Sequence, residues 1–164
     1  MNRFPLLTLA LLGAASLNAQ APASDTDKAF VGKVSQGGEY EVEASKLALT
    51  KASAQDVKDL ANSEVHDHEL VGHKLKSISA AAKVPIAPKL NVDFTEKLNH
   101  LRSLSGSDFD SAYLASMDEI HDKDEKLFAQ EAIDGSAQYK SFAAETDPIV
   151  KRHIGALHGT DAKN

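Results

Sequence analysis

Six residues with metal-ligating side chains fall at helical spacing within apolar segments of the chain. They are three carboxylates and three imidazoles: Glu41, Glu64, His68, His121, Asp124 and His153. Proteins use such oxygen and nitrogen ligands to bind iron, manganese, zinc and copper. Asp and Glu are almost never fully buried unless they are paired or hold a metal ion. The pattern therefore predicts one interior site for Fe, Mn, Zn or Cu, the alternative being no cofactor.

The period of 3.6 residues per turn places these six side chains on the apolar arcs of four predicted helices. Glu41, for example, shares an arc with Phe30 and Val34. Two further histidines, His66 and His73, fall on the opposite side of their helix and are expected to face solvent. The periodicity thus separates inward-facing histidines from outward-facing ones.

Height along the helices also brings the six residues together. Most of them lie within about a turn of the centres of their helices, and His153 lies about 7.5 Å from its centre at 1.5 Å per residue. In an antiparallel bundle they would cluster at mid-height. Glu131 shares an arc with His121 but lies about 15 Å along the helix from it. The apolar arcs therefore also carry an acid outside the predicted site.

Three interpretations of this pattern remain open at the level of sequence. The first is a bound metal ion. The second is a metal-free network of buried ion pairs and hydrogen bonds, which would fix the register of the helices. The third is a misassigned helical register, in which case the six side chains do not meet.

The elements that must position these residues are all predicted to be helices, because helix-favouring residues dominate and strand-like alternation is absent. The helices are expected over residues 26–51, 53–83, 93–104, 107–133 and 137–157. Ser53 with Asp56 resembles a capping box for the second helix, and Ser107 is the expected cap of the fourth. Pro148 predicts a kink or a restart in the last helix.

Four long helices and one short helix predict an all-α fold, an antiparallel four-helix bundle. The short extra helix lies in the connection between the second helix and the fourth. Gly37 and Gly38 fall inside the first helix, where each costs about 1 kcal/mol relative to alanine. They indicate either the close approach of a neighbouring helix or a tolerated kink.

Residues 1–19 have the order of a signal peptide. Arg3 precedes an apolar run over residues 6–15, which is too short to span a bilayer, and small residues follow. Cleavage is expected near Ala19, an uncleaved anchor being the alternative. A linker at 20–25, a bundle domain at 26–159 and a tail at 160–164 follow. The chain is thus predicted to be periplasmic or secreted, with no transmembrane segment after cleavage.

Composition narrows the class of partner. The net charge of −6 argues against nucleic acid or anionic lipid as partner. The absence of cysteine excludes zinc–thiolate sites, attached c-type haem and thiol chemistry. The sequence shows neither the Ser, His and Asp pattern of a hydrolase nor a glycine-rich loop that would bind phosphate. A metal ion or an unidentified protein is the expected partner, and enzymatic activity is not favoured.

Short motifs spread along the chain carry a resemblance to a known family. They are Gln36-Gly37-Gly38, Glu41-Val42-Glu43, Asp67-His68, Leu104-Ser105-Gly106, Phe109-Asp110, Tyr113-Leu114, Met117 with His121, and Pro148 with His153. In these motifs the chain resembles domain of unknown function 4142, a bacterial exported family often labelled predicted outer membrane protein. The resemblance implies a ferritin-like four-helix bundle of unestablished activity.

Ferritin-like di-iron proteins use a Glu from each of two helices and a Glu-x-x-His motif from each of the other two. Here Glu64 and His68 are four residues apart, and His121 precedes Asp124 in the reversed order. Di-iron oxidase chemistry is therefore disfavoured. The remaining hypotheses are a metal-binding bundle and a non-enzymatic envelope or stress interaction protein whose inward polar residues form a structural network.

Overall fold

The computed structural model describes residues 22–159, which form five helices and no strand. The helices are α1 (Asp25–Lys51), α2 (Gln55–Ala81), α3 (Val92–Ser103), α4 (Gly106–Asp134) and α5 (Ala137–Leu157). The all-helical prediction is therefore confirmed for this part of the chain. The predicted signal peptide with its cleavage point, the start of the linker and the 160–164 tail lie outside the described residues.

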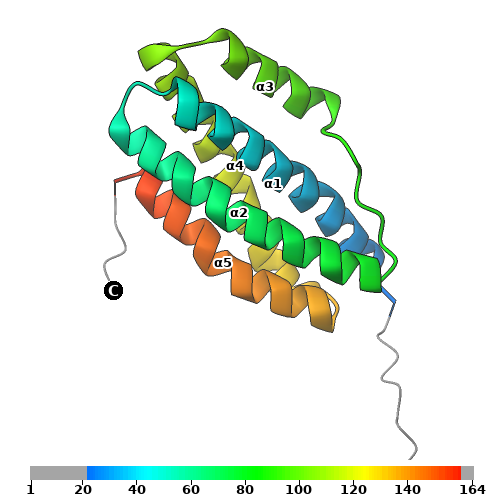
Figure 1. Ribbon diagram of the computed structural model, residues 1–164. Coiled ribbons are helices and arrows are strands. Elements are labelled where there is room, and N and C mark those ends of the chain that lie inside the picture. Colours follow the sequence, from blue (N-terminus) through cyan, green and yellow to red (C-terminus); the bar gives the residue numbers. More distant parts are fainter. Residues whose placement is uncertain (1–21, 160–164) are drawn as a thin grey trace, which may run out of the picture.

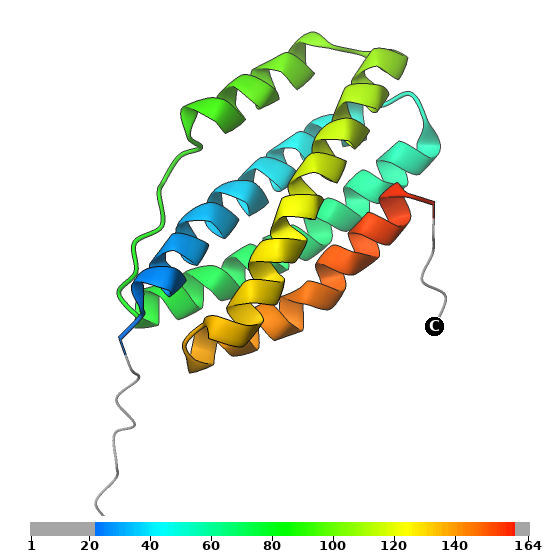
Figure 2. The same cartoon turned by 180° about the vertical axis from the view of Figure 1, so that it is seen from behind.

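The four long helices lie side by side, and α3 packs outside them (Figure 1). α1 packs against α2 and α4, and α5 packs against α4 and α2, so the four enclose one interior. The chain reverses direction between α1 and α2 and again between α4 and α5 (Figure 1). From behind, α4 runs along the face opposite α2, with α3 to one side of it (Figure 2). Residues distant in sequence are thus brought to the same height.

The interior contains two apolar clusters separated by a polar layer. One cluster is built around aromatic residues such as Tyr40, Phe109 and Tyr113. The other is built around Phe30 and other aromatic side chains, whose rings pack edge to face, with centroids 5.3 Å apart in the Phe30–Phe128 pair. Along α2, α4 and α5 the buried residues between the clusters are polar, and α1 adds the buried Glu41 to this layer. The site residues therefore occupy a layer closed from both ends by apolar packing.

The glycine pair in α1 has two different roles. A Cβ at Gly37 would lie 3.4 Å from the Ile120 side chain and 3.7 Å from the carboxylate oxygens of Asp124. A Cβ at Gly38 would meet nothing within 4 Å. Gly37 thus supports the close approach of α4 to α1, whereas Gly38 borders open space.

The predicted capping box of α2 is wrong. Ala54 is the N-cap and makes no side-chain hydrogen bond, so Ser53 and Asp56 do not form the box. Instead, Asp110 of α4 accepts hydrogen bonds from the backbone N–H groups of Ser53 and Ala54, each at 3.0 Å. A carboxylate from another helix thereby satisfies donors that have no intrahelical partner and complements the positive end of the helix.

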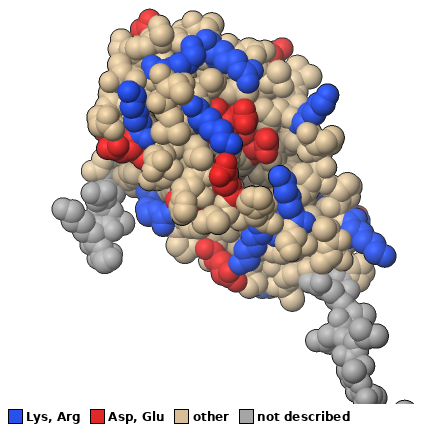
Figure 3. Space-filling view, viewed as in Figure 1, with Lys and Arg blue, Asp and Glu red and all other residues tan. Residues whose placement is uncertain are grey.

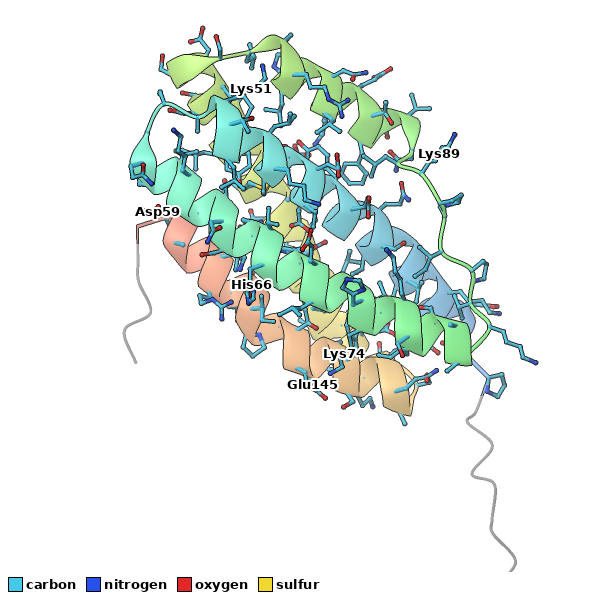
Figure 4. All side chains as sticks on the ribbon, viewed as in Figure 1. Lys51, Asp59, His66, Lys74, Lys89 and Glu145 are labelled. Atoms are coloured by element: carbon cyan, nitrogen blue, oxygen red, sulfur yellow. The ribbon has the colours of Figure 1, made fainter. Side chains whose placement is uncertain are left out.

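Other helix boundaries differ slightly from expectation. α4 is capped by Ser105 rather than Ser107, and α2 ends at Ala81, near Lys83 in the left-handed region at φ 57°. α5 continues through Pro148 without a restart. At the end of α1, the Lys51 ammonium donates to the carbonyls of residues 102 and 104 and so holds the turn between α3 and α4 (Figure 4).

Replacing Asp110 by Ala should lower the free energy of unfolding by about 1–2 kcal/mol, because the N–H groups of Ser53 and Ala54 at the start of α2 lose their acceptor. Urea denaturation followed by circular dichroism measures the loss. Asp122→Ala, at an exposed position in the middle of the same helix as Asp110, is the control and should change stability by no more than about 0.5 kcal/mol. Equal effects of the two substitutions would show that the cap contributes nothing.

A buried acid pair joins the start of α1 to the turn between α4 and α5. Asp27 accepts the backbone N–H of Ser24 at 2.6 Å and that of Ser136 at 2.9 Å. Burial and the adjoining Asp27 carboxylate raise the pKa of Glu131 to about 7. Glu131, the acid that the sequence analysis placed outside the predicted site, is therefore buried because it pairs with Asp27.

The raised pKa of Glu131 predicts a pH-dependent stability. Protonated Glu131 stabilises the fold fully below its unfolded pKa near 4.5, and this contribution is lost as pH rises through about 7. As the pH rises from about 5 to about 8, the melting temperature of the wild type should fall relative to that of Glu131→Gln, because the glutamine side chain stays uncharged. The exposed control Glu96→Gln should follow the wild type. A gap between wild type and Glu131→Gln that is unchanged by pH would contradict the assignment.

Candidate metal centre

All six residues predicted from the sequence are buried in the polar layer. Their exposed fractions are 0% for Glu41, Glu64 and His121, 5% for His68, 4% for Asp124 and 2% for His153. Four of the six form a compact set in which one ligand atom from each lies within 4.8 Å of the others: Glu64, His68, His121 and His153. The set draws on α2, α4 and α5. The outward-facing His66 and His73 are exposed, as expected.

The Glu64 carboxylate is the centre of this set. Its Oε2 atom lies 3.1 Å from Nε2 of His68 and 3.4 Å from Nε2 of His121. Its Oε1 atom lies 2.6 Å from Nδ1 of His153. Glu64 and His68 share one face of α2 because they are four residues apart. One acid therefore faces a nitrogen from each of three imidazole rings.

The second nitrogen of each ring faces another oxygen. Nδ1 of His68 lies 3.2 Å from Oε2 of Glu41, which is the contribution of α1 to the layer. Nδ1 of His121 lies 2.8 Å from the backbone carbonyl of Met117, one turn earlier in α4. Both oxygens can accept the N–H of a neutral ring. The nitrogen that faces the centre then carries the lone pair, which is the tautomer that a metal requires.

His153 has the same arrangement at the edge of the site. Its Nε2 atom lies 2.8 Å from Oδ2 of Asp67, and the guanidinium of Arg152 contacts the same oxygen. Burial disfavours the charged form of Asp67, but the hydrogen bonds from His153 and Arg152 outweigh it and lower the pKa. Asp67 was missed as a site residue, although its position three residues after Glu64 and next to His68 was a usable signal.

Electrostatics show how the protein's own groups balance the buried charge of the site. Burial opposes protonation of His68 and His121, but the charges of Glu41 and Glu64 raise the two pKa values to about 9 and about 10. The same contacts overcome burial and lower the pKa of Glu64 well below its ordinary value. Imidazolium protons therefore neutralise the buried acids. A divalent cation at the centre would supply positive charge at the same place.

Asp124 lies beside this set without joining it. Burial and the negative charge of Glu41 raise its pKa to about 8. Among residues 22–159, no hydrogen bond or ion pair reaches its carboxylate, and the charges of His68 and His121 only partly offset its burial. The sequence grouped Asp124 and Glu41 with the other ligands. The structure instead places Glu41 against the outer nitrogen of His68 and Asp124 on the wall of a cavity.

Comparison with known proteins gives one family and one similar fold. The family described as "Domain of unknown function (DUF4142)" matches residues 12–159. The chain belongs to this family. No curated protein matches this DUF4142 chain. A crystal structure of a DUF305 fragment from Deinococcus radiodurans is similar over 85% of this chain and 97% of the fragment, with a TM-score of 0.74 and 13% identity. At that identity, the likeness shows the fold alone.

Within residues 22–159, no helix of this DUF4142 protein combines the length and the apolar character needed to cross a bilayer.

Replacing His68 by Ala should strongly destabilise the fold, whereas His66→Ala should not. Without His68, the buried acids Glu41 and Glu64 lose a shared partner, and removing one member of a buried ion pair costs about 3–5 kcal/mol. His66 is exposed on α2 (Figure 4), and its loss should stay within about 0.5 kcal/mol. Urea denaturation in the presence of a chelator measures both. Two equally mild substitutions would refute the arrangement described above.

Proposed function

We propose that this protein binds one divalent transition-metal ion through four residues. They are Glu64, His68, His121 and His153. The observation that carries the proposal is a fully buried set of four ligand atoms within 4.8 Å of one another, supplied by three helices. The outer nitrogen of each histidine faces an oxygen acceptor. Such outer partners orient metal-binding histidines and strengthen them as ligands.

The donor set favours certain ions and a non-catalytic role. Three imidazoles and one carboxylate suit zinc or copper and are also compatible with iron or manganese. A site with four protein ligands has the closed composition of structural zinc sites, whereas catalytic zinc sites keep one position for water or substrate. We therefore propose sequestration or storage of the ion rather than an enzymatic reaction.

The finer description of fold and location belongs to the same proposal. Four long helices around a central polar layer support placing the chain in the ferritin-like group of antiparallel bundles. The order of charged, apolar and small residues in 1–19 supports export to the periplasm or beyond the cell. In that compartment a chain without cysteine binds metal through histidine and carboxylate alone.

A second function is favoured by one observation, the direct contacts of the buried imidazoles of His68 and His121 with the carboxylates of Glu41 and Glu64. Two imidazolium ions can neutralise Glu41 and Glu64 without any metal. In this case the polar layer only fixes helix register, and the protein acts through its surface as a non-enzymatic envelope or stress interaction protein.

Metal binding should appear as stabilisation of the folded protein. Protein without an affinity tag is titrated with Zn²⁺, Cu²⁺, Mn²⁺ or Fe²⁺ while its melting temperature is followed. An ion held only by the folded state adds about 2.7 kcal/mol at a free concentration of 100 times its dissociation constant. One equivalent per chain should suffice, and a chelator should reverse the effect.

The matched variants are Glu64→Gln and Glu69→Gln, both on α2. Glu64→Gln removes the central carboxylate and should abolish the response to metal. Glu69 is exposed, so its replacement should leave the response unchanged. If no ion shifts the wild type, or if Glu64→Gln responds as the wild type does, the metal-free network is the correct description.

A further inference from the structure

A cavity of about 540 Å³ leads from the surface to the polar layer. It lies between α1, α2 and the connector 84–91. Its lining includes apolar side chains such as Val34, Leu75 and Phe128. Three polar residues at its buried end belong to the layer described above, Glu41, His68 and Asp124. The cavity therefore joins solvent to the residues around the proposed centre.

Of the four proposed ligands, only His68 lines this cavity. Glu64 and His121 are 0% exposed and His153 is 2% exposed, so packing closes the other sides of the set. A second cavity of about 270 Å³ lies between α1, the start of α3 and α4, and it borders Asp124 but none of the four ligands. An ion from solvent therefore has its most direct path past His68.

Missing side chains on two facing helices keep the larger cavity open. Gly38 of α1 and Gly72 of α2 both line it, and a Cβ at either position would meet nothing within 4 Å. A glycine inside a helix costs about 1 kcal/mol relative to alanine. Gln36 holds the connector beside the cavity, because its amide donates to the Lys89 carbonyl at 3.1 Å and accepts the N–H of Asn91 at 2.7 Å (Figure 4).

Charged side chains of both signs line this path, because Lys46, Lys76 and Lys89 border the cavity as well as acids. Glu39 and Glu69 are exposed and line the cavity near the surface. Acidic side chains gather near the middle of the face formed by α1 and α2 (Figure 3). Lys46 of α1 contacts Glu69 of α2 at 2.9 Å and so spans the two helices. All three lysines are exposed, so the buried end of the cavity carries only the carboxyl groups of Glu41 and Asp124 beside His68, and acids at the end of a cleft attract cations.

Asp124 supplies a carboxylate that the protein itself does not use. It is 4% exposed and borders both cavities. Within the described chain, no hydrogen bond or ion pair engages its carboxyl group. The absence of a side chain at Gly37 lets α1 approach the Asp124 carboxyl group closely, since a Cβ at Gly37 would lie only 3.7 Å from its oxygens. A buried acid without a hydrogen bond or an ion pair, at the inner end of a cavity that opens to solvent, is suited to receive a cation.

We infer that the cavity between α1 and α2 is the access route for the metal ion and that Asp124 receives the ion before Glu64 and the three histidines bind it. In this step the Asp124 carboxyl group releases its proton to solvent, and one of its oxygens replaces a water of the hydrated ion. Glu64 and the three imidazoles then replace Asp124 and the remaining waters, and the protons on the ligating nitrogens also leave to solvent. The inference rests on the proposed function, because it concerns how the same site is loaded.

The test follows Co²⁺ binding by stopped-flow absorbance, because the final visible band reports the site and its rate of appearance reports the route. In the double variant Gly38→Leu and Gly72→Leu, the two side chains enter open space and obstruct the cavity. The rate should fall at least about tenfold while the final band stays the same. Asp124→Asn should also slow the rate, by roughly tenfold.

Two matched controls are available. Gly32→Leu adds the same side chain to α1 at an exposed position that borders the smaller cavity, and Asp122→Asn removes an exposed charge from α4. Neither should change the rate. Circular dichroism establishes that each variant is folded, and Gly38→Ala, which leaves the cavity largely open, should load at the wild-type rate.

The outcomes separate the access route from the site itself. Normal rates in the obstructed variant, or an equal slowing by Gly32→Leu, would overturn the route and leave metal binding intact. Slow loading in the obstructed variant alone supports the route. If the wild type develops no cobalt band, the proposed metal site is wrong and the access route falls with it.

Discussion

The burial of the Glu64 carboxylate among three imidazole rings is the interaction on which the rest of the bundle depends. An ionised acid removed from water is strongly unfavourable unless partners and hydrogen bonds surround it. Glu64 is fully buried, and its partners come from its own helix and from α4 and α5. A shift of any of these helices by one turn, about 5.4 Å, would take a histidine away from the acid and into an apolar cluster. The carboxylate therefore fixes the register of three helices at once.

α1 contributes no atom to the four-residue set, yet one short stretch of it supports the whole site. Gln36 holds the connector beside the bundle, Gly37 permits the close approach of α4, and Gly38 leaves space beside the cavity. Glu41 then faces the outer nitrogen of His68. The physical demands on these positions differ, although all four lie within two turns. Each residue of the Gln36-Gly37-Gly38 motif, and Glu41 one turn later, therefore has its own structural role.

Periodicity predicted the helices and the inward direction of the six polar residues, because both depend only on spacing along one helix. It could not predict which of the six meet, since that depends on side-chain direction and on the distance between helices. Asp124 and Glu64 looked equivalent on this basis, yet only Glu64 faces all three histidines. The Met117 acceptor is a backbone carbonyl and leaves no trace in residue types. The Asp110 cap was missed for a related reason, because it joins groups more than fifty residues apart.

Protons and a metal ion can neutralise the same buried acids, so charge balance alone does not separate the two functions. The cavity does bear on the choice. A polar network that only fixed register would be best sealed from water, because water competes with buried ion pairs and weakens them. Here Gly38 and Gly72 leave open space next to His68, and Asp124 carries a carboxylate without a partner in the described chain. Both features cost stability in a purely structural role. Both have a purpose if an ion must reach the centre from solvent, and this favours the metal-binding function over the structural network.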